Sequence, residues 1–496
     1  MICVTYAKSK AAKWSEIRSL IPPAVAVRGP CLKWVFMWHG PKEPETETRR
    51  RRRLMCRRPR KVKKILWSLV ASSLILRKMA SACNILNLPV EVLALIFKEL
   101  LDIKDKLNFA ETHPVLGKAF ALQAGDTYKK IDFGERSIAE WAKILSLCGP
   151  SVSRISSQAV NKSVAVTKLA SDFCPNLDEF FLAVRRRFWN HISPLLLTLK
   201  NLKWVGFIND FENVNVVDTL LKLPNLINLE LYNFNRQDVE RLKELVNLTE
   251  LTLFNKKGDP IDIYKICSTM KNMDSLHIKY GNIKIPKDLG GEQLWPKIEL
   301  LRIGYGLFYT PLPYLPTLQY LTIDNTDYRM KLNKIFGKTV TEYATTLESL
   351  RFCPETLRCI DLEEAATISK LKALKRLECQ LESDLYIDHF ITNLQQLESL
   401  SLQNSSNITC VGIVQLLGRC KKLRKLDVFG CRLLKKNLII PPAIAILHMN
   451  GVQSNNPLVL TVGSEFGMVT DELIGGVLLV KGHNSFQFFD LLSQLF

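Results

Sequence analysis

The stretch Leu226-Ile227-Asn228-Leu229-Glu230-Leu231-Tyr232 decides the fold of this chain, because its pattern recurs along much of the sequence. The pattern is apolar-x-x-apolar-x-apolar, and successive copies start 20 to 29 residues apart. A spacing of this length indicates a chain that is built from repeated supersecondary units. Twelve copies begin at Leu177, Leu202, Leu226, Leu248, Met273, Ile298, Leu318, Leu347, Leu374, Leu397, Leu423 and Ile444.

Each copy predicts a short strand that follows a helix. Alternation along the strand sends Leu229 and Leu231 inward. Asn228, Glu230 and Tyr232 then face outward. Upstream, apolar residues recur at helical spacing until a proline interrupts them. The pattern therefore predicts an α/β fold, a leucine-rich-repeat solenoid of about 12 to 13 irregular repeats in a horseshoe, whose stacked units share one core and leave a concave surface.

A compact helical module is predicted upstream, over residues 85–125. Pro89 suits the first turn of a helix, and Glu91 lies near the positive end of the helix dipole. Two more short helices follow, one capped by Asp105 and one spanning 114–125. The first helix presents one apolar face, made of Val92, Leu93, Ile96, Phe97 and Leu100.

The run Leu88-Pro89-x-Glu91, followed by Ile96-Phe97, Leu100 and Asp105, resembles the F-box. With the repeats behind it, the chain resembles an F-box/leucine-rich-repeat protein over residues 85 to 450. The resemblance implies docking on the Skp-type adaptor of an SCF ubiquitin ligase, and through it on cullin and RING subunits, while the repeats bind a protein substrate. It also implies that the adaptor is contacted by Leu88, Pro89, Glu91, Ile96, Phe97, Leu100 and Leu107.

Two other interpretations stay open. In one, the chain is a repeat scaffold that binds partners without any ligase, and the helix over 92–100 only covers the first repeat. In the other, it is an extracellular repeat domain whose glycosylation sequons are used. Co-purification of the adaptor with the chain distinguishes a ligase subunit from a repeat scaffold. A mobility shift after glycosidase treatment tests whether the chain is an extracellular repeat domain.

The positive charge is concentrated before Met79. Residues 1–78 hold 20 Lys and Arg against 4 Glu, whereas the other 418 residues hold 48 basic and 44 acidic residues. The repeats are therefore not a general polyanion binder, and no specific nucleic acid is expected. We interpret 1–78 as a basic, disordered arm or a non-native extension, with Met79 as the usual start. The apolar run Ile65–Leu76 is too short to span a bilayer, so we expect no membrane association and a cytoplasmic or nuclear location.

Motifs for catalysis or metal binding are missing from the sequence. The thirteen cysteines include no Cys-x-x-Cys pair and none at zinc-finger spacing from histidine. We expect them to be reduced core residues, many of them near repeat boundaries. A Walker-type loop, a Gly-x-Ser-x-Gly elbow and a His-Glu-x-x-His helix are also absent. The chain is therefore expected to be a non-enzyme without a cofactor or metal.

Candidate substrate contacts are the outward residues of the repeat strands. Their charge is mixed, which favours a protein partner over nucleic acid. Exposed aromatic residues between charged neighbours suit a protein interface. The residues selected on this basis are Tyr232, Phe254, His277, Lys279, Asp324, Asp427 and Phe429.

The two ends of the solenoid are less regular. Residues 126–175 are predicted to open it with a strand at Tyr128–Phe133, a helix around Trp141–Leu147 and a degenerate copy of the pattern at Val152 and Ile155. The solenoid proper covers 176–450. Residues 451–496 form a cap or tail, with a last edge strand at Leu458–Val462 and a covering helix that carries Phe486, Phe489, Leu492 and Phe496.

Overall fold

The computed structural model describes residues 85–134, 136–210, 216–233, 236–254, 260–280, 282–284, 297–306, 308–324, 330–353, 359–389, 391–463, 466 and 471–482. The chain divides into two compact units, Met1–Ile85 and Leu86–Phe496, and the fold below belongs to the second. The predictions for residues 1–78 and for the helix at Phe486–Phe496 lie outside the described residues. No helix in the described ranges is long and apolar enough to cross a membrane.

Three short helices begin the second unit, after a 3-10 turn at Ile85–Asn87: α5 (Val90–Glu99), α6 (Ile103–Glu111) and α7 (Pro114–Ala124). Pro89 is the residue before α5, and Glu91 lies in its first turn. Pro114 opens α7, while the side chain of His113 accepts a hydrogen bond from the Val115 N–H. The predicted three-helix arrangement of this module is therefore present.

Two details of the module differ from the prediction. Asp102 caps α6 by accepting from the Lys104 N–H, whereas Asp105 lies within the first turn of that helix. Val92 is 40% exposed and does not join the buried face of α5. Helix α5 carries enough apolar residues to form two stripes, one buried and one exposed. Leu93 and Phe97 belong to the buried stripe, which faces the core.

Across the described residues, the repeat strands form one sheet of sixteen strands in which all neighbours are parallel except β17 and β18. Spatial order follows sequence order up to β16, because each strand is joined to the next through a helix or loop on the other side. The strands are β1 (Lys130–Asp132), β2 (Arg154–Ser157), β3 (Glu179–Arg185), β4 (Trp204–Asp210), β5 (Asn228–Tyr232), β6 (Glu250–Phe254), β8 (Ser275–Lys279), β10 (Leu300–Gly304), β11 (Tyr320–Asp324), β12 (Ser349–Cys353), β13 (Arg376–Glu378), β14 (Ser399–Ser401), β15 (Lys425–Asp427), β16 (Leu458–Val462), β18 (Leu478–Gly482) and β17 (Glu472–Ile474).

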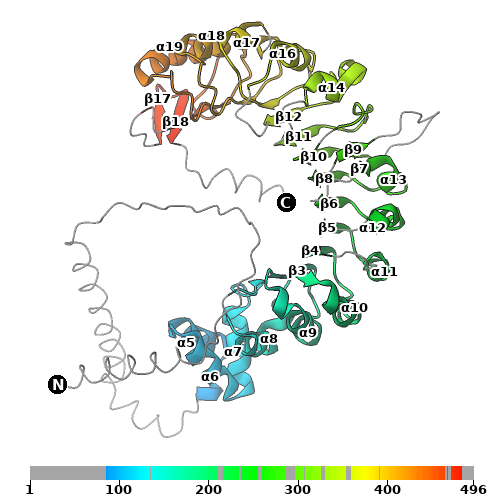
Figure 1. Cartoon of the computed structure of the whole chain (residues 1–496). Coiled ribbons are helices and arrows are strands. Elements are labelled where there is room, and N and C mark those ends of the chain that lie inside the picture. Colours follow the sequence, from blue (N-terminus) through cyan, green and yellow to red (C-terminus); the bar gives the residue numbers. More distant parts are fainter. Residues whose placement is uncertain are drawn as a thin grey trace, which may run out of the picture. The chain divides into compact units, whose positions relative to one another are not determined.

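Helices cover one face of this sheet, and the strands line the inside of its curve (Figure 1). The helices between strands are α8 (Ile138–Cys148), α9 (Ser163–Phe173), α10 (Trp189–Leu196), α11 (Val217–Leu220), α12 (Arg236–Arg241), α13 (Ile263–Cys267), α14 (Leu332–Phe336), α15 (Val340–Tyr343), α16 (Leu362–Ile368), α17 (Asp384–His389), α18 (Cys410–Arg419) and α19 (Lys436–Met449). A separate pair of parallel strands, β7 (Pro260–Asp262) and β9 (Asn282–Lys284), lies outside the main sheet.

The register of the sheet aligns the same position of the pattern in every repeat. Leu229 is opposite Leu251, and this row of leucines continues without a gap through β8, β10, β11, β12, β13, β14 and β15 to Leu460 of β16. Members of the row are at most 2% exposed. The predicted alternation in β5 is confirmed, because Leu229 and Leu231 are buried while their three neighbours are only partly covered.

The C-terminal end corrects two predictions. The pattern that starts at Ile444 is not a strand, because residues 444–449 belong to helix α19. The next strand is β16, as predicted at Leu458–Val462, but it is not at the edge. Strand β18 pairs with it in parallel, and β17 adds antiparallel to β18.

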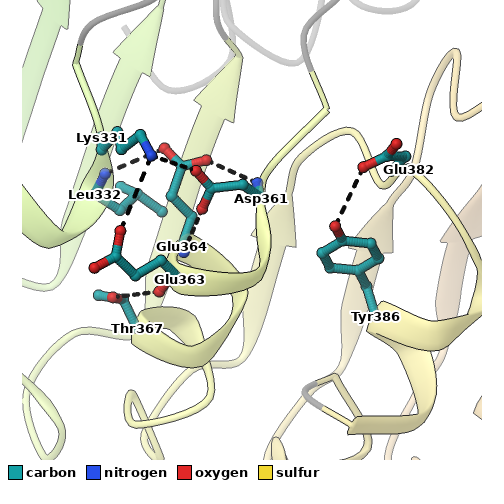
Figure 2. Close-up of polar contacts among 8 residues, drawn as sticks. All are labelled: Lys331, Leu332, Asp361, Glu363, Glu364, Thr367, Glu382 and Tyr386. Atoms are coloured by element: carbon teal, nitrogen blue, oxygen red, sulfur yellow. Dashed lines mark hydrogen bonds and ion pairs between the residues drawn. The ribbon is translucent and has the colours of Figure 1, made fainter.

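Neighbouring repeats are also joined by polar contacts on the helical side (Figure 2). Glu364 of α16 is fully buried, and its carboxylate accepts from the backbone N–H of Asp361 at 2.9 Å and of Leu332 at 3.3 Å. Asp361 in turn caps α16 by accepting from the Glu364 N–H, and Lys331 pairs with Asp361 at 2.8 Å. One buried carboxylate therefore fixes the first turns of both α16 and α14.

The hydrophobic core is continuous from the helical module into the repeats. A chain of ring contacts crosses the junction, from Phe97 to Phe120 at 5.6 Å, then to Tyr128 at 6.5 Å and Trp141 at 6.2 Å. The module therefore covers the open end of the first repeat. The predicted core cysteines Cys174, Cys267, Cys420 and Cys431 are buried free thiols.

Candidate functional site

A groove of about 690 Å³ lies on the strand-lined face of the sheet, over strands β1 to β10. Its residues are the outward positions of successive strands, which the parallel register stacks in rows. The residues used below are Arg154 (β2), Phe181 (β3), Trp204 (β4), Glu230 (β5), Glu250 and Thr252 (β6), His277 and Lys279 (β8) and Arg302 (β10). We call this surface the concave groove.

Two polar side chains, Thr252 and His277, form the floor of the groove. Each is 8% exposed although it lies on the outward side of its strand. The Nε2 atom of His277 is buried and has no hydrogen-bond partner among the described residues. Burial lowers the pKa of His277 well below its usual range, and the nearby cations Lys279 and Arg302 lower it further. The imidazole is therefore neutral at pH 7.

The carboxylates of the groove are held in a partly desolvated setting. Burial raises the pKa of Glu230, against the effect of a hydrogen bond from the Tyr232 hydroxyl at 2.5 Å. Burial also raises the pKa of Glu250, and the charge of Glu230 adds to this shift. Glu250 accepts a hydrogen bond from the Asn228 amide at 2.9 Å.

Aromatic rings border the groove in a continuous series. Trp204 stacks on Phe181 with ring centroids 5.7 Å apart, and Phe181 meets Tyr232 edge-on at 6.2 Å. Tyr232 stacks on Phe254 at 4.0 Å, and the Lys279 ammonium lies 4.7 Å from the centre of the Phe254 ring. Because the rings support one another, their side-chain conformations are fixed before any partner arrives.

The series ends on two tyrosines with unusual backbones. Tyr280 and Tyr305 directly follow β8 and β10, and both have positive φ angles, of 56° and 54°. Their rings stack at 4.4 Å, and Tyr280 also approaches Phe254 at 5.8 Å. Asn233 and Asn404 adopt the same conformation after β5 and β14. Asparagine tolerates this conformation, whereas tyrosine there is an outlier of the kind that collects at functional surfaces.

Beyond the groove, the same face carries neutralised charges. Arg351 of β12 pairs with Asp324 at 2.8 Å and with Glu378 at 3.0 Å. Asp427 of β15 accepts from the Gln403 amide at 2.7 Å and from the Phe429 N–H at 3.0 Å. These carboxylates already have partners within the sheet.

The structure brings together four of the predicted substrate contacts, Tyr232, Phe254, His277 and Lys279, on three adjacent strands. Asp324 lies two strands further along, and Asp427 and Phe429 lie four strands beyond that, so the seven residues do not form one site. Their role in binding stays a prediction. Sequence reasoning missed Arg302, Glu250, Trp204, Tyr280 and Tyr305.

The residues predicted to contact an adaptor fall into two groups. Leu88, Pro89 and Glu91 are exposed, and Ile96 and Leu100 are partly covered. Phe97 is fully buried and Leu107 is 3% exposed, so both belong to the core of the module and offer no surface for direct contact. The structure adds exposed apolar residues that the sequence analysis did not select, namely Leu95 at 62% and Leu101 at 99% exposure.

The repeated pattern, the in-register parallel strands and the layer of helices together define a leucine-rich-repeat solenoid. Among the described residues, no group of three or more His, Cys, Asp or Glu side chains is placed to hold a metal ion. Burial raises the pKa of the Cys148, Cys174 and Cys267 thiols to about 12, so these cysteines are inert packing residues.

No family model and no curated protein matches the chain. Solved structures do match. A chain of the yeast Rad7 and Elc1 complex aligns over 86% of this chain and 98% of its own length, at 15% identity and a TM-score of 0.39. An internalin from Listeria monocytogenes aligns over 52% of this chain and 76% of its own, at 19% identity and a TM-score of 0.32. A leucine-rich-repeat protein from Leptospira interrogans aligns over 58% and 80%, at 17% identity and a TM-score of 0.30.

Proposed function

We propose that this chain is the substrate-recognition subunit of an SCF-type ubiquitin ligase. The module α5–α7 acts as an F-box that docks on the Skp-type adaptor, which connects it to the cullin and RING subunits. The concave face of the repeats binds a protein substrate. The chain is not an enzyme and needs no cofactor. Its contribution to ubiquitin transfer, in the cytoplasm or nucleus, is to supply proximity and orientation.

The observation that carries this proposal is an exposed apolar stripe on the module. Val92 and Leu95 are 40% and 62% exposed, and their spacing places them on one side of α5. Leu88, which is 39% exposed, lies just before the helix. The opposite side of α5 packs into the core through Leu93 and Phe97. A helix that merely covered the first repeat needs only the buried side, so the second stripe indicates a partner surface. Its position matches the motif that resembles the F-box.

Replacing Leu88 and Pro89 together by alanine is expected to abolish recovery of the adaptor. Both residues are exposed, so the loss reflects a missing contact and not an unfolded module. Interface anchors are typically worth about 2 kcal/mol or more, which lowers adaptor recovery by more than about tenfold. The measurement is affinity purification of the full chain from cells, with mass spectrometry of adaptor and cullin subunits.

Leu438→Ala is the matched control, because Leu438 is an apolar residue of α19 that is 55% exposed. This variant should recover the adaptor at the wild-type level. If the double variant recovers the adaptor at the wild-type level, the F-box assignment is wrong. If the wild-type chain itself recovers other proteins but no adaptor or cullin, the result would instead support a repeat scaffold that acts outside a ligase.

A further inference from the structure

Between β5 and β10, the charges in the concave groove are sorted by sign across neighbouring strands. Glu230 of β5 and Glu250 of β6 lie on one side, and Lys279 of β8 and Arg302 of β10 lie on the other. Nearer β1 the groove is lined by charges of both signs, among them Arg154 of β2, which pairs with Glu179 at 3.2 Å. The part of the groove over β5 to β10 therefore presents an acidic half followed by a basic half.

Burial acts against the charged form on both sides. Burial raises the pKa of both glutamates, and burial lowers the pKa of Lys279 and of Arg302. Arg351 gives the contrast on the same face, because there the opposing effect of Glu378 and Asp324 outweighs burial and the pKa is raised. The charges of the groove are thus partly desolvated, and opposite charges on a partner would offset the cost of this desolvation.

The distance between the two halves suits an extended peptide. Glu250 and Arg302 are two strand spacings apart across the sheet, which is about 9 to 10 Å, and two residues apart along the strands, which is about 6 to 7 Å, so their separation is about 12 Å. An extended chain advances about 3.3 Å per residue and therefore crosses that distance in about four residues. We propose that the concave groove binds an extended peptide segment with a basic side chain over Glu230 and Glu250 and, about four residues away, an acidic side chain between Lys279 and Arg302. This inference rests on the proposed function only in treating the bound protein as the substrate.

A carboxylate suits the basic half better than a phosphoryl group does. A phosphoryl group carries about −1.5 to −2 at pH 7, and Glu230 and Glu250 lie close enough to repel the additional charge. The same glutamates disfavour a nucleic-acid backbone. A peptide with one charge of each sign is complementary to both halves.

His277 gives the acidic side chain a third polar contact. It lies between Lys279 on its own strand and Arg302 on the next, and its Nε2 atom has no partner among the described residues. The atom is enclosed, so a neighbouring side chain of the groove must move aside before a carboxylate oxygen accepts from it. The fixed rings of Tyr232 and Phe254 border this position and limit the conformations that a bound peptide adopts.

The test uses the purified full chain and pools of short peptides that are randomised except at two positions, four residues apart. Two pools carry Lys and Glu at these positions, one in each order. Another pool carries Gln at both positions, and a last one carries phosphoserine in place of Glu. One order of the Lys and Glu pool should be retained at least about tenfold more than the Gln pool, as expected for charge-assisted contacts. Equal retention of these pools, or stronger retention of the phosphoserine pool, overturns the proposal.

Reversing the basic half gives a sharper comparison. The variant Lys279→Glu with Arg302→Glu should lose the preference for Glu and gain one for Lys at that position. Lys425→Glu, an exposed lysine of β15 on the same face, is the matched control and should behave as wild type. An unchanged preference in the double variant overturns the assignment. Adaptor recovery should be normal in both variants, so a failure of the ligase role and a failure of the groove give different results.

His277→Leu separates a binding role from a structural one. Because the buried Nε2 atom lacks a partner, an apolar side chain of similar size should leave the melting temperature unchanged or raise it. Retention of the Lys and Glu pool should nevertheless fall several-fold. A lower melting temperature with unchanged retention would make His277 a core residue and remove it from the site.

Discussion

Leu229→Ala is expected to lower the free energy of unfolding by about 2 to 5 kcal/mol. Leu229 is 1% exposed and lies between Val205 and Leu251 in the row of residues that every repeat contributes to the core. The truncation leaves a cavity shared by three repeats, and strands at such close spacing collapse poorly around it. Chemical denaturation of the full chain, followed by circular dichroism, measures the loss.

Glu230→Ala, one position further along the same strand, should change the free energy of unfolding by less than about 1 kcal/mol. Glu230 faces the groove, and what it loses is a hydrogen bond from Tyr232 together with a partly buried charge. Comparable losses from both substitutions would mean that the inward and outward positions of the strand have been exchanged.

Glu364→Ala should cost about 3 kcal/mol or more, because one buried and one partly buried backbone N–H group lose their acceptor at once. The affected groups are those of Asp361 and Leu332, which belong to the first turns of adjacent repeat helices. Glu364→Gln should give a smaller loss, since one of its two acceptor oxygens is kept. Differential scanning calorimetry of the full chain measures both variants.

The neighbouring Glu363 provides the control for this prediction. Its side chain is 65% exposed, and its contact with Lys331 is long, at 3.9 Å. Exposed ion pairs of this kind contribute little, so Glu363→Ala should stay within about 0.5 kcal/mol of wild type. Similar losses at the two positions would show that helix charge, and not the buried contacts, stabilises α16.

The sequence predicted the repeat strands well because their alternation is imposed by the sheet itself. The prediction failed at Ile444, where the same spacing of apolar residues fits one face of a helix. Ile444 and Leu447 lie three positions apart, which is a helical neighbour distance as well as a part of the strand pattern. A pattern of three apolar residues does not distinguish the two periods when the next repeat is irregular.

The candidate site was predicted only in part, because alternation gives the side of the sheet and not the degree of burial. His277 was correctly expected on the outward side, but its enclosure depends on neighbouring strands that are distant in sequence. Phe97 and Leu107 show the same limit in the module, where both are core residues. Tyr280 was missed because it follows its strand in a left-handed conformation that no alternation rule describes. Arg302, by contrast, occupies an ordinary outward position in β10 and was available to the same reasoning.

Strand β17 bears on how copies of this chain meet one another. A parallel sheet that ended at β18 would present an open edge to which the first strand of a second copy could add, and head-to-tail addition of that kind grows into a filament. β17 has three residues, runs antiparallel to its neighbour, and carries Glu472 and an exposed Leu473. A strand that ran in the same direction as the other strands would have to pair with β17 antiparallel. Because β17 has only three residues, it offers few backbone N–H and C=O groups for such pairing. At the opposite end the helical module covers the first repeat, so removing that module to test the proposed ligase role would also expose a surface for polymer growth.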